Sequence, residues 1–140
     1  MSFIADLPLL DKDNAEFNFA VDFVLNTQRL VYLTGKAGTG KTTFLKHLRS
    51  VCDKKMVVLA PTGVAAVNAG GQTIHSFFNI KPSVYVPGDK RLRFHNPQND
   101  PDQTMITDHF RYQREKLDLI RHLELLVIDE ISMVRCDLLD

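Results

Sequence analysis

The sequence predicts an α/β fold, in which helices flank a sheet of parallel strands. Three apolar segments, 30–34, 56–60 and 125–129, have the length and composition of buried strands. Segments with helical spacing separate them, and this alternation of strand and helix is typical of a parallel sheet. The 140 residues are enough for one domain, or for most of one.

A helix is expected near the N-terminus, ending at about Thr27. Asp11 or Asp13 is the expected cap, because a carboxylate accepts hydrogen bonds from the free N–H groups of a first helical turn. The apolar side chains of this segment recur at the i, i+3, i+4 spacing of one helix face. They are Phe17, Ala20, Val21, Val24 and Leu25.

The middle of the chain then follows the predicted alternation. Gly35 ends the first strand, and helical spacing predicts a helix over 41–51. The second strand, 56–60, stops at Pro61. Small residues over 64–69 predict a short helix, which two glycines close. Thr73 is expected to cap one further helical turn, because its hydroxyl accepts a backbone hydrogen bond.

The predicted organisation divides the chain into consecutive segments. A helix over 107–122 precedes the third strand, and it follows a loop or insertion marked by prolines and charges. The segments in order are an N-terminal helical region (1–29), a strand–loop–helix unit (30–51), a second strand with its helices (56–80), the loop or insertion (81–105), and a helix with the third strand (106–140).

Composition excludes several classes of protein. Hydrophobic residues make up 44% of the chain and charged residues 24%, values that argue against disorder. The 17 basic and 17 acidic side chains cancel, so bulk charge does not attract nucleic acid or membrane, although a local basic patch is compatible. The sequence has no secretory signal and no apolar run long enough to cross a membrane. Two isolated cysteines, Cys52 and Cys136, predict free thiols and a reducing, cytoplasmic compartment.

The segment from Gly35 to Thr42 matches the phosphate-loop motif G-x-x-x-x-G-K-[ST] at every required position. Glycines let backbone N–H groups curl around a phosphate, and the helix that follows directs its N-terminal dipole at the same anion. Lys41 supplies a positive charge to the β- and γ-phosphates, and the Thr42 hydroxyl is a ligand for Mg²⁺. A chance match is disfavoured, because the motif lies between an apolar strand and an amphipathic helix. The predicted nucleotide-binding residues of this P-loop NTPase are Gly35, Lys36, Ala37, Gly38, Thr39, Gly40, Lys41, Thr42 and Thr43.

Two acids, Asp129 and Glu130, end the third strand. Ligands of open parallel sheets bind at the C-terminal ends of strands, so Asp129 is expected to face the phosphate loop and to hold Mg²⁺. Glu130 would orient and deprotonate the water that attacks the γ-phosphate of ATP. The simpler alternative is a strand that ends in solvated acids. The phosphate loop favours the catalytic interpretation, in which Lys41 acts together with the two acids.

Three stretches resemble the PIF family of superfamily-one DNA helicases, which are relatives of RecD. They are the phosphate loop Gly-Lys-Ala-Gly-Thr-Gly-Lys-Thr-Thr, the stretch at 60–78, and the run Ile-Asp-Glu-Ile-Ser-Met-Val at 128–134. Three motifs in the order of that family are more specific than a phosphate loop alone. The resemblance implies a RecA-like parallel sheet flanked by helices. It also implies an ATP-driven 5′-to-3′ translocase that unwinds DNA in repair, recombination or telomere maintenance.

The same resemblance implies contacts with single-stranded DNA. Thr62 and Gly63 would lie near the DNA backbone, where a hydroxyl and a bare N–H group suit phosphate oxygens. For His75, a DNA contact and a structural hydrogen bond are weighted equally. Phe77 and Phe78 could stack on a base, but core packing is the favoured interpretation for both.

The chain departs from the family pattern in two places. The Gln that reads adenine in the family corresponds here to Asn18, with Gln28 as a poor substitute, which puts adenine selectivity in doubt. The chain also stops at Asp140, before the family's third motif and the second RecA-like domain whose arginine completes the ATP site. We therefore expect an N-terminal fragment of a motor domain, truncated after the strand that bears the second motif. By itself this fragment should be inactive, with the second RecA-like domain as its partner.

The resemblance has a further consequence for the sheet. In RecA-like ATPases a later strand lies between the phosphate-loop strand and the strand that bears the second motif. Residues 30–34 and 125–129 should therefore not pair directly, and their facing edges should stay open.

Two other functions remain as alternatives. The chain could be a nucleotide-dependent regulatory module without productive hydrolysis, which the second acid, Glu130, disfavours. It could also be a small-molecule P-loop kinase, which the stretch at 62–78 disfavours.

Overall fold

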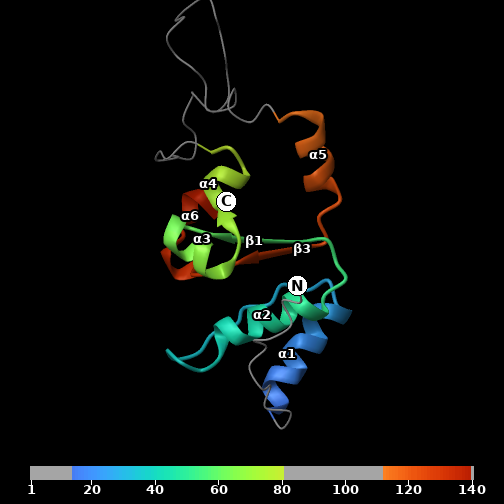
Figure 1. Ribbon diagram of the computed structural model, residues 1–140, viewed down its shortest axis with the longest axis vertical. Coiled ribbons are helices and arrows are strands. Elements are labelled where there is room, and N and C mark those ends of the chain that lie inside the picture. Colours follow the sequence, from blue (N-terminus) through green and yellow to red (C-terminus); the bar gives the residue numbers. More distant parts are fainter. Residues whose placement is uncertain (1–13, 81–111, 140) are drawn as a thin grey trace, which may run out of the picture. The chain divides into compact units, whose positions relative to one another are not determined.

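The computed structural model describes residues 14–80 and 112–139 (Figure 1). The chain divides into two compact units, 1–54 and 55–140. From residue 14 onward, the regular structure of the first unit is helical. A parallel sheet with flanking helices makes up the second, so the α/β prediction is confirmed. The loop or insertion predicted at 81–105 lies outside the described residues.

The described part of the first unit contains two helices, α1 (Ala15–Asn26) and α2 (Lys41–Val51). The bounds of α2 are those that the sequence predicts. Phe17 of α1 and Phe44 of α2 meet edge to face, with ring centroids 5.4 Å apart and an interplanar angle of 76°. Lys54 ties the chain beyond α2 to the C-terminal end of α1, because its ammonium donates to two backbone carbonyls there, at 2.7 and 3.0 Å. These contacts hold the two helices together.

The N-terminus of α1 differs from the prediction. Asn14 is the cap, and its side-chain oxygen accepts a hydrogen bond from the Phe17 N–H at 2.9 Å. The prediction of Asp11 or Asp13 as the cap is therefore wrong. Those residues precede the described part of the chain, and Asn14 stands one residue before the first turn, where its amide reaches the free N–H group.

Residues 30–34, all of them described, do not form a strand, so the prediction of a first strand is wrong. Their side chains lie open to solvent, with Leu30 98% and Tyr32 71% exposed. A strand exists only where a neighbour pairs its backbone N–H and C=O groups, and the described residues provide none for this segment. The expected separation of this segment from 125–129 by a later strand stays a prediction.

Among the residues that the structure describes, the sheet of the second unit has three parallel strands in the order β2-β1-β3. The central strand β1 (Met56–Ala60) has the predicted bounds, and β3 (Leu125–Ile128) agrees with the predicted third strand to one residue. β3 pairs with β1 along its length, whereas β2 (Gln72–Thr73) pairs only with the C-terminal end of β1. The sequence analysis missed β2, because two residues are too few to show an alternating pattern.

Two short helices follow β1, and a threonine caps each of them. The Thr62 hydroxyl accepts a hydrogen bond from a backbone N–H of α3 (Gly63–Ala69) at 3.2 Å. The Thr73 hydroxyl accepts one from the first turn of α4 (Ile74–Phe77) at 3.1 Å, as predicted. Gly70 closes α3 in a left-handed conformation with φ 65°. Both predicted helices after the second strand are therefore present.

Further helices flank β3. The helix before it, α5 (Arg114–Arg121), begins later than predicted, with Gln113 as its N-cap. Residues 112 and 113 are described and are not helical, so the prediction of one continuous helix over 107–122 is wrong there, and 107–111 lie outside the described residues. After β3 come a 3₁₀ turn, η3 (Ile131–Met133), and a short helix, α6 (Cys136–Leu139). The sequence analysis did not predict either of these elements.

The core of the second unit packs against β1. It is built around Leu59, Ile74 and Phe77, and Leu59 and Phe77 are 0% and 1% exposed. Gly71 allows the turn before β2 to pass directly over this strand, since a Cβ atom there would overlap the Val58 carbonyl oxygen. The segment that leads from β1 to α4 is thus held by the close approach of its backbone to β1 at Gly71 and by the apolar core.

Candidate functional site

The predicted phosphate loop precedes α2 in the first unit. Gly38 and Gly40 adopt left-handed backbone conformations, with φ 79° and 91°, which side chains with a Cβ rarely adopt. Gly40 is the N-cap of α2 and has no side chain to bond the free N–H groups of the first turn. The loop therefore turns into the helix so that these donors remain available for an anion.

Hydrogen bonds within the loop hold its lysine in place. The Lys41 ammonium donates to the carbonyl of Gly35 at 2.7 Å and to that of Lys36 at 2.9 Å. The Thr39 hydroxyl donates to the same Lys36 carbonyl at 2.8 Å. At Gly35 a Cβ atom would come 2.5 Å from the Thr39 hydroxyl oxygen, so this close turn requires glycine. The loop thus surrounds the Lys41 ammonium, which can give up its two carbonyl acceptors and donate to phosphate oxygens instead.

The predicted acids end β3 in the second unit. The backbone N–H of Asp129 donates to the Leu59 carbonyl at 2.8 Å, which continues the pairing of β3 with β1. One carboxylate oxygen of Asp129 accepts a hydrogen bond from the Glu130 N–H at 3.0 Å. Glu130 has φ 52°, a left-handed conformation that is uncommon for residues other than glycine and recurs at functional sites. The chain turns sharply here, and the Glu130 side chain is exposed.

The predicted nucleotide residues lie in different units of the chain. Lys41 and Thr42 belong to the first unit, and Asp129 and Glu130 to the second. Within the described residues there is no group of three or more His, Cys, Asp or Glu side chains placed to hold a metal ion.

The predicted DNA-contacting residues lie on the segment from β1 to α4. Thr62 is half-buried, and its hydroxyl oxygen is already the cap of α3, so the residue has a structural role. Gly63 is exposed, with open space where a Cβ atom would stand. His75 is half-buried in α4. Core packing is confirmed for Phe77, and Phe78 is partly buried beside it, with ring centroids 4.8 Å apart.

Asn18 and Gln28, the two candidates for reading adenine, are both exposed. Asn18 lies in α1, and Gln28 follows the end of that helix. Their part in base recognition stays a prediction.

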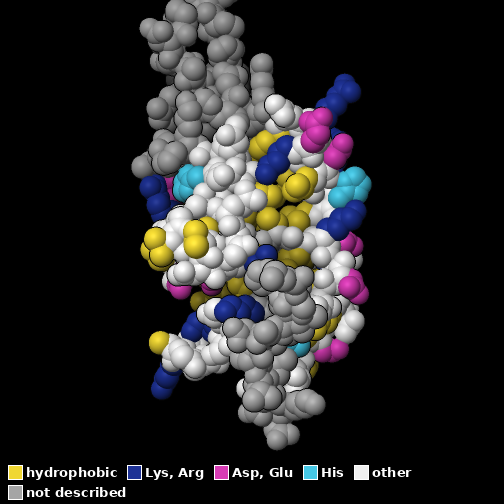
Figure 2. All heavy atoms as spheres, viewed as in Figure 1, with side chains coloured by type: hydrophobic (Ala, Val, Ile, Leu, Met, Phe, Trp, Pro, Cys, Tyr) yellow, Lys and Arg dark blue, Asp and Glu magenta, His cyan; other side chains and the backbone are white. Residues whose placement is uncertain are grey.

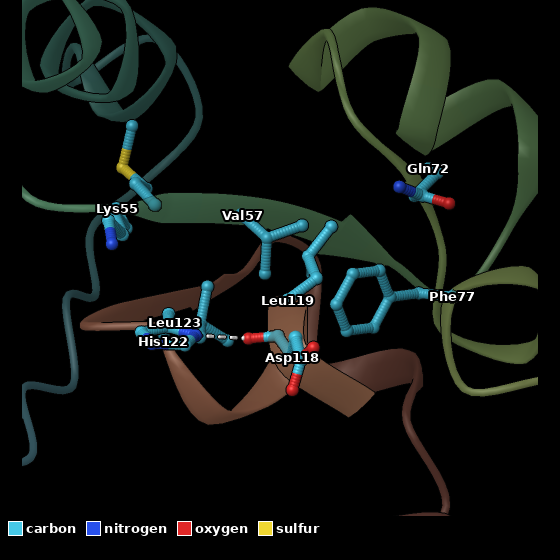
Figure 3. A pocket seen from close by; sticks show the side chains of 9 residues that line it. Lys55, Val57, Gln72, Phe77, Asp118, Leu119, His122 and Leu123 are labelled. Carbon is cyan, nitrogen blue, oxygen red and sulfur yellow. Dashed lines mark hydrogen bonds between the residues drawn. The ribbon is translucent and has the colours of Figure 1, made fainter. Parts of the chain in front are cut away.

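A groove of about 510 Å³ opens in the second unit between α4, α5 and the sheet. Figure 2 shows hydrophobic side chains at the surface there, with basic, acidic and histidine side chains around them. Figure 3 shows Val57, Phe77 and Leu119 pointing toward one another from β1, α4 and α5. His122 borders the groove, and its ring Nδ1 donates to the Asp118 carbonyl at 2.6 Å.

The sequence analysis missed two contacts that join the end of α4 to the start of α5 and the residues just before it. The Tyr112 hydroxyl donates to the Phe78 carbonyl at 2.6 Å, and the Lys116 ammonium lies 3.7 Å from the centroid of the Phe77 ring. Burial raises the pKa of the Tyr112 phenol above its ordinary value. The sequence gives no signal for these pairs, because their partners are more than thirty residues apart along the chain.

Neither cysteine forms a disulfide, which agrees with the predicted free thiols. None of the helices in the described ranges has the length and apolar character needed to span a membrane.

Comparisons with known proteins agree on one family. The family model described as PIF1-like helicase matches residues 9–140. The ATP-dependent DNA helicase RRM3 of Saccharomyces cerevisiae is 34% identical over 125 residues, which are 86% of this chain and 15% of that protein. A crystal structure of Bacteroides sp Pif1 in complex with ADP-AlF4 has a TM-score of 0.70 at 39% identity, covering 90% of this chain and 25% of its own. Bacteroides Pif1 bound to ssDNA has a TM-score of 0.70 at 41% identity, covering 91% of this chain and 25% of its own.

The chain therefore spans about a quarter or less of each protein named above. The likeness to these Pif1 structures, at about 40% identity, assigns the chain to the RecA-like P-loop fold. The fold class that the sequence predicts is confirmed.

Proposed function

Because the chain belongs to the PIF1-like helicase family, we propose that it is part of the ATP-driven motor of a DNA helicase. In the full-length protein this motor would move 5′ to 3′ along single-stranded DNA and unwind duplexes. The observation that supports the proposal most strongly is the closed phosphate loop, with Lys41 held at its centre and an uncapped helix behind it.

ATP is the proposed nucleotide, and the loop residues 35–43 are its proposed phosphate cradle. Backbone N–H groups at the start of α2 would bind the phosphate oxygens, and Lys41 would leave its two carbonyl partners to contact the β- and γ-phosphates. The loop's glycine conformations are already present, so nucleotide binding would mainly exchange hydrogen bonds.

Mg²⁺ is the proposed metal, and the donor set fits it. Thr42 offers a hydroxyl oxygen and Asp129 a carboxylate oxygen, and hard cations prefer oxygen ligands. When bound, Mg²⁺ would neutralise charge on the phosphates. The Asp129 carboxylate also accepts the Glu130 N–H, which orients the next residue. Glu130, exposed at the sharp turn, would accept the proton of the attacking water.

Single-stranded DNA is the proposed polymer, and the proposed contacts come from Thr62, Gly63 and His75. Gly63 is exposed and without a Cβ, so a DNA backbone could approach closely. The Thr62 hydroxyl oxygen caps α3, but its proton is still available to a phosphate. A second RecA-like domain of the full-length protein is the proposed partner that completes the ATP site.

The proposed biological setting is genome maintenance through repair, recombination or telomere upkeep. A reducing compartment such as the cytoplasm is proposed from the two free thiols.

The test is ATP turnover and ATP binding by the full-length protein, with and without single-stranded DNA. Glu130→Gln should keep ATP binding and lower turnover about 100-fold or more, because the amide keeps the shape but cannot accept the proton. Lys41→Ala should instead weaken ATP binding by about tenfold to 100-fold, because a charge-assisted phosphate contact is lost.

Matched controls lie on the same units. Lys46→Ala on the exposed face of α2 and Glu115→Gln in the first turn of α5 should leave both measurements unchanged. Unaltered turnover in Glu130→Gln would contradict its role as the base. Wild-type protein that binds ATP and DNA but does not hydrolyse ATP would favour the regulatory module instead.

A further inference from the structure

The segment proposed to contact DNA is joined to α5 and to the residues just before it by two contacts, which the neighbouring residues Phe77 and Phe78 make. The Tyr112 hydroxyl donates to the Phe78 carbonyl at 2.6 Å. The Lys116 ammonium lies 3.7 Å from the centroid of the Phe77 ring, close enough for a cation–π interaction. His75 lies in the same short helix, α4, as Phe77. A displacement of α4 would therefore break contacts with α5.

Both contacts suit their surroundings. Phe78 is the C-cap of α4. The carbonyls at the C-terminal end of a helix have no N–H donor within that helix, and the Tyr112 hydroxyl supplies a donor for one of them. Burial raises the pKa of Tyr112, which keeps the phenol protonated and able to donate. Phe77 is 1% exposed, so the Lys116 ammonium interacts with a ring that is shielded from water.

α5 is otherwise held loosely at this end. None of its residues, all of which the structure describes, is buried, and Ile120 is only partly buried against the core. The chain just beyond its other end is held beside the start of β1, because Glu124 and Lys55 exchange hydrogen bonds. The Lys55 N–H donates to the Glu124 carboxylate at 2.8 Å, and the Glu124 N–H donates to the Lys55 carbonyl at 2.9 Å. β3 begins at the next residue and leads to Asp129.

We propose that Tyr112 and Lys116 are positioning residues that couple DNA contact at α4 to the acids at the end of β3. The inference rests on the proposed function. The physical route is continuous in the described chain. Phe77 of α4 contacts Lys116 in the first half of α5, and the α4 cap Phe78 contacts Tyr112 just before α5. α5 then leads into β3, which is followed by Asp129 and Glu130. Binding of single-stranded DNA would act on α4 and, through these two contacts, on the placement of the catalytic acids.

The experiment measures ATP turnover with and without a single-stranded oligonucleotide, and the affinity for that oligonucleotide, in the full-length protein. Tyr112→Phe removes only the hydroxyl, and Lys116→Met keeps an apolar side chain of similar length without the charge. Lys116→Arg restores a cation over the ring. Arg121→Met on the same helix is the matched control, because Arg121 forms only an exposed pair with Asp118 in the described structure.

The expected result is a loss of coupling without a loss of chemistry. In Tyr112→Phe and Lys116→Met, turnover without DNA should stay within about twofold, while the stimulation by DNA falls about fivefold or more. DNA affinity should change less than the stimulation. Lys116→Arg and Arg121→Met should keep the stimulation of the wild type.

Three outcomes separate the explanations. A stimulated wild type with equally stimulated Tyr112→Phe and Lys116→Met overturns this inference alone. Equal losses of turnover with and without DNA also overturn it, because a merely structural role would lower both. A wild type that DNA does not stimulate overturns the proposed function, and this inference with it.

Discussion

Two apolar segments of equal length, 30–34 and 56–60, precede the two loops on which the proposed function depends. The second is the central strand β1, paired on both edges and buried at Leu59. The first forms no strand, and Leu30 is almost fully exposed. Their compositions are alike, so composition does not decide between them. The difference is that neighbouring strands from other parts of the chain pair with 56–60.

Those neighbours are themselves distant in sequence. β1 is paired by β3, which begins more than sixty residues later, and the two are joined at their starts by Glu124 and Lys55. In the described residues β3 has a strand partner only on its β1 side. On its other side, the described part of the chain leaves β3 without a paired strand, and such an edge readily accepts one.

The largest effect is expected from Leu59→Ala in β1. Removing a fully buried side chain from the centre of the second unit should cost about 2–5 kcal/mol of unfolding free energy. Hydrogen exchange of backbone amides measures this loss separately in β1 and in α2. Protection in α2 should persist. An equal loss in both places would show that the two units unfold together, which would break the comparison.

A smaller effect is expected from Thr62→Val. The β-branched shape remains, but the α3 cap is lost, at a cost of about 0.5–2 kcal/mol. Thr62→Ser keeps the hydroxyl and is the matched control. Denaturant unfolding of both variants, followed by hydrogen exchange in α3, checks the result. Equal stability of the two variants would contradict the capping role.

The smallest effect is expected from Leu30→Ala. Because the side chain is 98% exposed, the unfolding free energy of the 140-residue chain should change by no more than about 0.5 kcal/mol. The same substitution in the full-length protein sharpens the comparison. A loss of about 2 kcal/mol or more there would show that residues 30–34 gain a partner and a buried environment.

Local signals explain what the sequence could predict. The phosphate-loop motif fixes where α2 begins, so Lys41–Val51 is predicted to the residue, and Thr73 marks the start of α4 through its own hydroxyl. The acids after β3 follow from a run of apolar residues that ends in charge. In each case the determining atoms lie within a few residues of one another.

The features that could not be predicted depend on contacts between residues far apart in the sequence, or on the backbone conformation of one residue. The 30–34 segment needs a lateral partner, and Tyr112 needs a carbonyl 34 residues away. The strand β2 exists because Gly71 lets the backbone approach Val58, which no local pattern reveals. Likewise, nothing in the letters Asp-Glu indicates that Glu130 takes a left-handed conformation.

At position 130, the left-handed backbone conformation sets selection for stability against selection for activity. A left-handed backbone costs a residue with a Cβ about 1–2 kcal/mol relative to glycine, so stability alone favours glycine or asparagine there. The chemistry proposed for this site requires a carboxylate. Directed evolution for heat resistance would therefore tend to discard Glu130, whereas directed evolution for ATP turnover would keep it. At this position a more heat-resistant protein and a faster ATPase would require different residues.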